Sequence, residues 1–124
     1  MSTHSRVGYT HANGTISSIY IHFDGYYEEV GRTLLEHYNS LERAEEIVAL
    51  GDASTLDATL EKSVFYSRDH SETGVEAELS KNLDEFYQDC RDSAASFAYL
   101  WLDGGWKTGL NHMTPLKDEF EKAL

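Results

Sequence analysis

The stretch "VGYTHANGTISSIYIHF", residues 7–23, decides the fold because it predicts a β-hairpin. Asn13-Gly14 is typical of a type I′ turn, since both residues tolerate the positive φ angles that this turn needs. Counting outward from the turn pairs the strands as follows: Ala12 with Thr15, Tyr9 with Ser18 and Val7 with Tyr20. The two strands should pair within an antiparallel sheet.

The second strand of this hairpin alternates between two faces. Ile19, Ile21 and Phe23 share the face that we expect to meet the core, and Tyr20 and His22 share the other. Asp24-Gly25-Tyr26-Tyr27 follows, and we expect it to turn the strand into a helix, with Gly25 in a backbone angle that other residues avoid.

Helical spacing of apolar residues continues beyond this corner. Tyr27, Val30, Leu34 and Tyr38 predict a helix from about Tyr27 to Tyr38. The spacing of Asn39-Ser-Leu-Glu42 is that of a capping box, so a second helix should start there and end at Gly51. Ser54-Thr-Leu-Asp57 predicts a short third helix with Leu56 and Leu60 inside.

The second half of the chain repeats these patterns. Residues 63–69, "SVFYSRD", read as a strand, and Asn82 caps a helix. The apolar stripe of that helix has five members: Leu83, Phe86, Tyr87, Cys90 and Ala94. Residues 96–109 predict a second hairpin with Asp103-Gly104 at its turn, and Thr114-Pro115 predicts a tail helix over about 115–123 carrying Leu116 and Phe120.

These elements predict an α+β fold: a small antiparallel sheet of two hairpins and one further strand, packed with about four helices. The chain of 124 residues has no linker or repeat, so we expect one domain over 1–124. We expect residues 1–6 to be flexible and residues 110–124 to be a C-terminal helical extension.

Acidic residues dominate the charge. The chain has 22 acidic and 10 basic side chains, a net charge of −12, and residues 28–92 hold 17 of the acidic and 6 of the basic ones. Such a field repels nucleic acid and anionic lipid, so we expect neither as a partner. Apolar runs are short, which predicts no membrane-spanning segment. With one cysteine no internal disulfide can form, which favours a reducing cytoplasm.

No complete catalytic pattern occurs in the chain. Cys90 lies on a predicted buried stripe beside Asp89 and Asp92, whose charges oppose thiolate formation. The glycines of "DGGWKTG" lack the spacing of a phosphate-binding loop. The six histidines are scattered; His22 and Asp24 could share a face, with Asp69 or His70 as a third ligand. We therefore expect no metal, no cofactor and no enzymatic activity.

Two short polar motifs lie at predicted strand ends, where loops commonly carry function. The first comprises His22, Asp24 and Tyr26, and the second comprises Tyr66, Arg68 and Asp69. If their strands are neighbours, Arg68 could approach Asp24, and Tyr26 and Tyr66 could wall a shallow pocket. Two interpretations stay open: a ligand or partner site, or a structural Arg68–Asp24 ion pair.

The chain resembles a family of small proteins from bacteriophage and prophage genomes, most of which have no assigned activity. The resemblance covers most of residues 6–108 and rests on four short sequence motifs. Their matching residues are Ile19, Tyr20, His22, Asp24, Gly25 and Tyr26; Gly31, Leu34, Leu35, His37 and Tyr38; Leu50, Gly51 and Asp52; Phe65, Tyr66, Arg68 and Asp69. Two departures matter: Tyr27 replaces the family's usual proline, and His70-Ser71 replaces Arg-Gly.

The resemblance implies an accessory protein in the cytoplasm of an infected bacterium. We expect it to bind and modulate or inhibit a host protein, such as a defence or nucleic-acid enzyme with a basic surface. The first two helices offer six acidic residues for this contact: Glu28, Glu29, Glu36, Glu42, Glu45 and Glu46. The alternative is a binder of a small, nucleotide-like ligand at Asp24, Tyr26, Tyr66 and Arg68. Homo-oligomerisation is also open.

Overall fold

The computed structural model describes residues 2–121. The predicted hairpin is present as β1 (Ser5–Thr10) and β2 (Ile16–Ile21), but its register differs by one residue. Val7 pairs with Ile19 and Tyr9 with Ser17. The turn is longer than predicted, because Asn13 does not adopt a positive φ and Gly14 alone does, at 90°. His11 N donates to Thr15 O at 2.8 Å, which closes a wider loop with a glycine bulge.

The sheet is larger than predicted and mixed in direction. Eight strands take part, in the order β4-β3-β2-β1-β6-β7-β8, with β5 also paired to β2. β6 (Phe97–Leu102) lies parallel to β1, and β3 (Ala53–Thr55) lies parallel to β2. The fold class is α+β, as predicted. Parallel neighbours need long crossovers, and the intervening helical segments provide them.

The first face of the sheet is covered by the segment that follows β2. A wide π-helical turn, η1 (Tyr27–Gly31), leads into α1 (Arg32–His37), which confirms the predicted helix, and α2 (Leu41–Ala49) follows. The cap of α2 is Ser40, one residue later than predicted, and its hydroxyl accepts from Arg43 N. Val7, Ile19 and Tyr99 of the sheet are buried against these helices.

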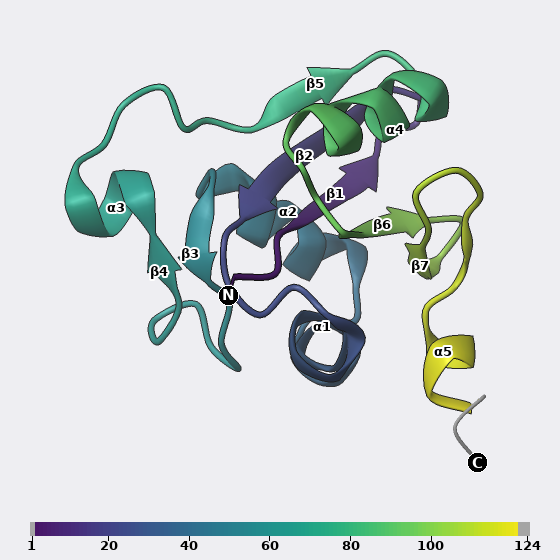
Figure 1. Ribbon diagram of the computed structural model, residues 1–124, viewed down its shortest axis with the longest axis horizontal. Coiled ribbons are helices and arrows are strands. Elements are labelled where there is room, and N and C mark those ends of the chain that lie inside the picture. The colour runs from purple at the N-terminus through teal and green to yellow at the C-terminus, as the bar shows by residue number, and fades with distance from the viewer. Residues whose placement is uncertain (1, 122–124) are drawn as a thin grey trace.

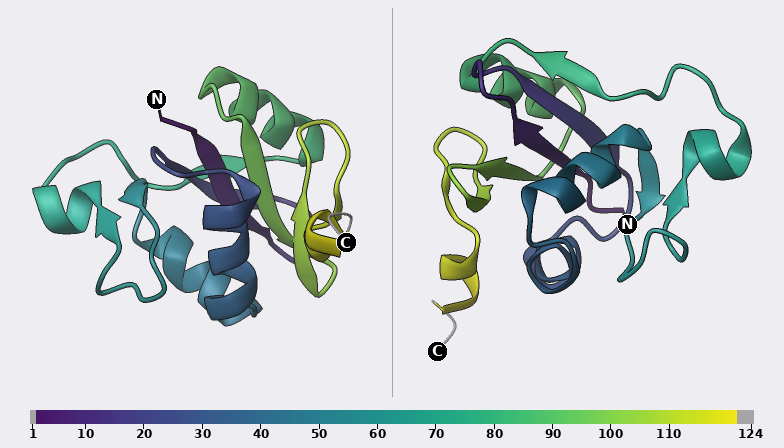
Figure 2. Two further views of the ribbon diagram at one scale, coloured as in Figure 1. Left: turned by 60° about the horizontal axis from the view of Figure 1, so that its bottom comes forward. Right: turned by 180° about the vertical axis from the view of Figure 1, so that it is seen from behind.

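The second face is covered by α4 (Leu83–Asp92), whose predicted cap is confirmed because Asn82 Oδ1 accepts from Glu85 N at 2.9 Å. Phe86 and Cys90 pack there against Ile16 and Leu100. Ala94 was wrongly placed on this stripe: it follows the helix, exposed, with φ 56°. Figures 1 and 2 show α1 and α2 on one side of the central strands and α4 on the other, so those strands are buried on both faces.

Three segments differ from the predictions. Residues 54–60 form no helix; Ala53 instead pairs with Ile21, which makes β3. The predicted strand 63–69 is limited to β4 (Val64–Phe65), and α3 (Tyr66–His70) follows and projects from the body in Figure 1. Ser5 and Arg6 were expected in a flexible stretch, yet both are buried in β1.

The C-terminal half forms the other edge of the sheet. β6 and β7 (Gly105–Thr108) form the predicted hairpin, with Asp103-Gly104 at its turn, where both residues have a positive φ. β8 (Thr114–Pro115) pairs with β7 before α5 (Lys117–Glu121), so Pro115 ends a strand rather than starting the helix. The predicted end of the tail helix at residue 123 lies outside the described residues. β5 (Glu78–Ser80) completes the sheet beside β2.

Candidate functional site

The residues of the first polar motif lie in two places: His22 belongs to a cluster of rings, and Asp24 and Tyr26 belong to the corner after β2. His22 follows β2, and its Nδ1 lies 2.8 Å from the hydroxyl of Tyr20. The imidazole of His4 stacks on that of His22, with 4.7 Å between ring centroids. This cluster of His4, Tyr20 and His22 ties the segment before β1 to the end of β2. Phe23, expected in the core, is 42% exposed beside it, past the end of β2 at Ile21.

The corner itself is built around Tyr99 of β6. The Tyr99 hydroxyl donates to Gly25 O at 2.6 Å, and Gly31 packs against the same ring. Burial raises the pKa of Tyr99, so this phenol stays a donor. Asp24 has the positive φ, at 59°, and its carbonyl accepts from Val30 N. The polar residues of the corner therefore make the turn that starts η1.

Gly25 is required for space and not for a backbone angle, which corrects our prediction. A Cβ built on Gly25 would lie 2.8 Å from Ser5 Cβ and 2.9 Å from Thr3 O. Gly25 N also donates to Thr3 O at 2.9 Å. The chain before β1 crosses directly over the corner, and only a residue without a side chain admits that approach.

In the second polar motif, Arg68 and Asp69 form a structural clasp on α3. Arg68 donates to both carboxylate oxygens of Asp69 and to Ser63 O at 2.7 Å. Asp69 also accepts from Phe65 N at 2.8 Å. The Arg68 guanidinium lowers the pKa of the Asp69 carboxyl by hydrogen bonding. The expected Arg68–Asp24 pair is not formed, because Arg68 has its partner one residue away.

The six predicted residues thus do not form one pocket. Asp24 lines a hollow of about 240 Å³ with Glu29 and Asp57, while Arg68 and Asp69 are engaged with each other on α3. Within residues 2–121, no hydrogen bond, ion pair or ring contact joins Asp24 or Tyr26 to Tyr66 or Arg68. The arrangement does not support the ligand pocket that we predicted from these four residues.

Asp52 has a structural task that the sequence did not reveal. The edge of β2 is split, with β5 beside Ile16–Ser18 and β3 beside Ile21. In the gap, Asp52 Oδ1 accepts from Tyr20 N at 2.9 Å, in place of a strand partner. Burial raises the pKa of Asp52, although the Tyr20 hydrogen bond opposes that rise.

Replacing Asp52 by alanine should cost about 1–3 kcal/mol of unfolding free energy, because Tyr20 N loses its acceptor. Asp52→Asn keeps an acceptor oxygen and should cost less than about 1 kcal/mol. A raised pKa means that this group contributes stability below its unfolded value of 3.8, a contribution lost as pH rises through the folded value. In urea denaturation the cost of Asp52→Asn relative to the wild type should therefore grow from neutral pH to about pH 4. Equal losses in both variants would show that charge, and not the acceptor, matters.

The six acidic residues predicted for partner contact are all exposed. They lie on η1, α1 and α2, which share one face of the sheet, but they border different hollows. Glu28 and Glu36 border one of about 550 Å³ beside α5, and Glu29 borders that of Asp24. Glu46 forms an ion pair with Arg43 at 2.9 Å. The acids therefore share a layer without forming one patch.

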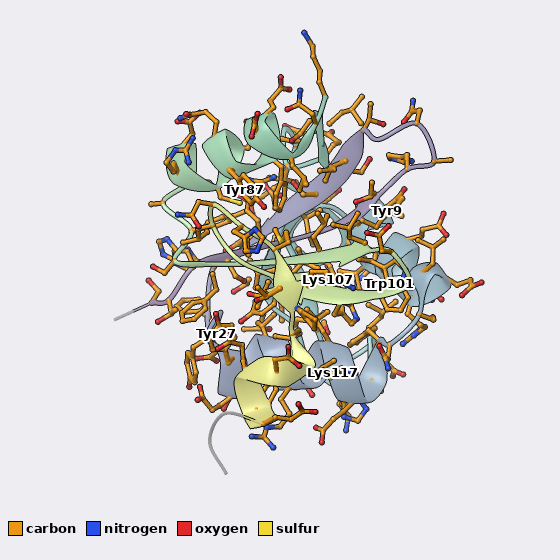
Figure 3. All side chains as sticks on the ribbon, turned by 90° about the vertical axis from the view of Figure 1, so that its right-hand side faces the viewer. Tyr9, Tyr27, Tyr87, Trp101, Lys107 and Lys117 are labelled. Carbon is orange, nitrogen blue, oxygen red and sulfur yellow. The ribbon has the colours of Figure 1, made fainter. Side chains whose placement is uncertain are left out.

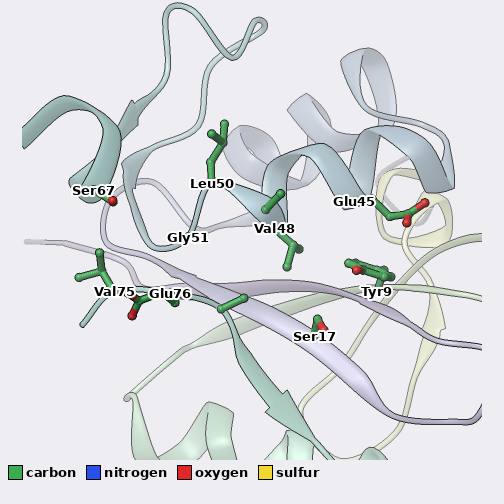
Figure 4. A pocket seen from close by; sticks show the side chains of 11 residues that line it. Tyr9, Ser17, Glu45, Val48, Leu50, Gly51, Ser67, Val75 and Glu76 are labelled. Atoms are coloured by element: carbon green, nitrogen blue, oxygen red, sulfur yellow. The ribbon is translucent and has the colours of Figure 1, made fainter. Parts of the chain in front are cut away.

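Glu45 borders a groove of about 360 Å³ between α2 and residues 75–77. Its base includes Tyr9 and Ser17 of the sheet, and its sides include Val48 and Val75. Figure 4 shows Glu45 at one end beside Tyr9 and Glu76 at the other beside Val75. Apolar walls with a carboxylate at each end suit a cationic group that carries an aliphatic stem.

Two features of the sequence point to this groove: an acidic residue, Glu76, and the Tyr9–Ser17 pair of the hairpin. Glu76 belongs to the acidic segment 28–92, but it lies in a loop, and no sequence pattern predicts where that loop runs. Tyr9 and Ser17 are opposite one another in the hairpin, but the predicted register paired Tyr9 with Ser18. A one-residue error in a turn moves the partner to the other face, which concealed the pair.

Cys90 is buried, as predicted, and its environment makes it a poor nucleophile. Burial raises the pKa of the Cys90 thiol to about 12. Its thiolate is therefore scarce at neutral pH. In the part of the chain that the structure describes, no three His, Cys, Asp or Glu residues converge on a point where they could bind a metal ion.

Comparison with protein-family models, curated proteins and solved structures finds no match. What is established is a mixed-sheet α+β fold whose acidic helices cover one face. None of the helices within residues 2–121 has the length and apolarity needed to cross a bilayer.

Proposed function

We propose that this chain is a non-enzymatic binding protein that holds a basic protein partner through its acidic helical layer. The observation that carries the proposal is the exposure of Glu28, Glu29, Glu36, Glu42, Glu45 and Glu46 on η1, α1 and α2. Among these six, Glu46 is the one with an ion pair to a described residue. Five carboxylates of the layer are therefore available to cations on a partner.

The charge of the chain supports a protein partner over a nucleic acid. A net charge of −12 repels phosphate backbones and attracts basic surfaces, and it speeds their encounter. Exposed single ion pairs are weak, so affinity requires several of them together with apolar contact. The layer carries several exposed carboxylates, and Leu41 at the start of α2, 40% exposed, adds an apolar contact.

The residues whose side chains could take part in catalysis have structural roles instead, which supports binding over catalysis. Arg68 and Asp69 clasp α3, Asp52 completes the edge of β2, and the Cys90 thiol is protonated and buried. By its resemblance to phage proteins, we further propose a host protein as the partner and the infected bacterial cytoplasm as the setting, an argument by association. An enzyme that acts on nucleic acid, including one used in host defence, is the kind of partner we propose, because binding of the phosphate backbone relies on lysine and arginine side chains.

Charge reversal on α2 tests the proposal. The immobilised chain, its Glu42→Lys/Glu45→Lys/Glu46→Lys variant and a control variant are each incubated with bacterial lysate. The control is Glu61→Lys/Asp84→Lys/Asp92→Lys, whose three acids are equally exposed but lie outside the layer. Retained proteins are quantified by mass spectrometry, after the melting temperatures of all three are compared.

We expect basic proteins to be retained by the wild type and the control and to fall at least about tenfold on the α2 variant. Equal retention by the α2 variant and the wild type would overturn the proposal. Equal loss from both variants would also overturn it, because attraction would then come from the net charge and not from the helical layer.

A further inference from the structure

A row of side chains crosses four strands on the face of the sheet that α2 only partly covers. Register places Trp101, Tyr9, Ser17 and Leu79 side by side, because Tyr9 pairs with Trp101 and Ser17, and Ser17 pairs with Leu79. Side chains paired in this way point to the same face. Tyr9 and Trp101 lie on the side of the sheet that carries α2 in Figure 3.

This row is incompletely buried at both ends. Leu79 is 64% exposed, the most exposed large apolar side chain among residues 2–121. Leu41, at the start of α2, is 40% exposed and borders a second hollow of about 460 Å³ with Trp101 and His11. His11 joins the two hollows: its ring lies 4.7 Å from that of Tyr9, and its Nε2 is 2.7 Å from Ser17 Oγ.

The charges around the row favour a cationic partner. Glu45 and Glu76 border the first hollow. Glu78, the neighbour of Leu79 in β5, is on the opposite face of the sheet and forms an ion pair with Arg6 at 3.8 Å, so it does not belong to this surface. No lysine or arginine is found among the described residues that line either hollow. A second copy docked on this face would bring these carboxylates against their equivalents, which is repulsive. A segment with cationic side chains meets no such cost.

We propose that the row Trp101–Tyr9–Ser17–Leu79 is the docking surface for a basic, amphipathic segment of a partner protein. Apolar side chains of that segment pack on Leu79, Tyr9 and Trp101. A lysine or arginine enters the groove between Glu45 and Glu76, its stem against Val48 and Val75. The inference rests on the proposed function, to which it adds the place and the mixed apolar and cationic character of the contact.

A synthetic eight-residue peptide of alternating lysine and leucine is the probe. Its matched controls replace every lysine by glutamate, or every leucine by serine. Binding of each fluorescent peptide to the full chain is followed by anisotropy. Leu79→Ser tests the apolar contact, with Leu110→Ser as its control because Leu110 is also exposed. Glu76→Lys tests the charge, with the exposed Glu61→Lys as its control.

We expect the lysine–leucine peptide to bind and each control peptide to bind at least about tenfold more weakly. Leu79→Ser and Glu76→Lys should each weaken binding by about tenfold, with Leu110→Ser and Glu61→Lys near the wild type. Unchanged binding by Leu79→Ser and Glu76→Lys, together with a loss in Glu28→Lys/Glu36→Lys, would overturn the inference but leave the acidic layer as the binding surface.

Two other results are also decisive. Equal binding of the lysine and glutamate peptides, or no binding of either, would overturn both the inference and the proposed function. Self-association of the chain that Leu79→Ser abolishes would overturn the inference alone, because the row would then be an interface between copies.

Discussion

Replacing Gly25 by valine is expected to destabilise the fold by about 3 kcal/mol, which lowers the melting temperature by roughly 10 °C. The added side chain would collide with Ser5, at 2.8 Å, and with the backbone of Thr3 and His4. Those residues lead into the central strand, so relief of the collision requires β1 to shift. The loss is measured by thermal and urea unfolding.

Gly105→Val is the matched control for this prediction. Gly105 also lies at a strand, in β7, but the nearest atom to its added Cβ is a side-chain atom, Lys107 Nζ, at 3.4 Å. We expect that variant to stay within about 1 kcal/mol of the wild type. Similar stability of Gly25→Val and the wild type would show that the chain does not cross the corner as closely as described.

Phe86→Ala should lower the free energy of unfolding by about 3–5 kcal/mol, because it leaves a cavity at the centre of the apolar cluster between α4 and the sheet. Phe86 is fully buried on α4 and packs with Tyr87 and Cys90 against Ile16 and Leu100. Without it, α4 loses the contact that covers the second face of the sheet. Urea unfolding monitored by circular dichroism gives the free energy.

Phe23→Ala makes the same substitution at a side chain that is 42% exposed, and it should cost less than about 1 kcal/mol. The comparison separates the position from the residue type. Equal costs for the two variants would contradict a sheet whose central strands are buried on both faces.

The local elements could be predicted from the sequence where one signal was sufficient. Helix α4 followed from the Asn82 cap, and the β6–β7 hairpin followed from Asp103-Gly104, because both signals act over a few residues. The predicted register of the first hairpin was wrong by one residue, because Asn13-Gly14 is compatible with turns of two different lengths. The parallel neighbours β1–β6 and β2–β3 could not be predicted, since residues distant in sequence decide them.

The candidate site was predicted less well than the fold. His22, Asp24, Arg68 and Asp69 are polar because they build corners and clasps, and sequence patterns do not distinguish that use from ligand binding. The six glutamates were correctly expected on the surface of the first two helices, since charge favours solvent. The groove of Tyr9 and Glu76 required the register and the course of residues 75–77, which only the folded chain supplies.

The salt dependence of partner capture tests the central claim most directly. Proteins from bacterial lysate are bound to the immobilised chain at about 0.05 M salt and then challenged at about 0.5 M, where exposed charges are strongly screened. A partner held by carboxylates of the helical layer should be a basic protein and should be released at the higher salt. Retention that does not change with salt, or nucleic acid recovered with the purified chain, would contradict the account.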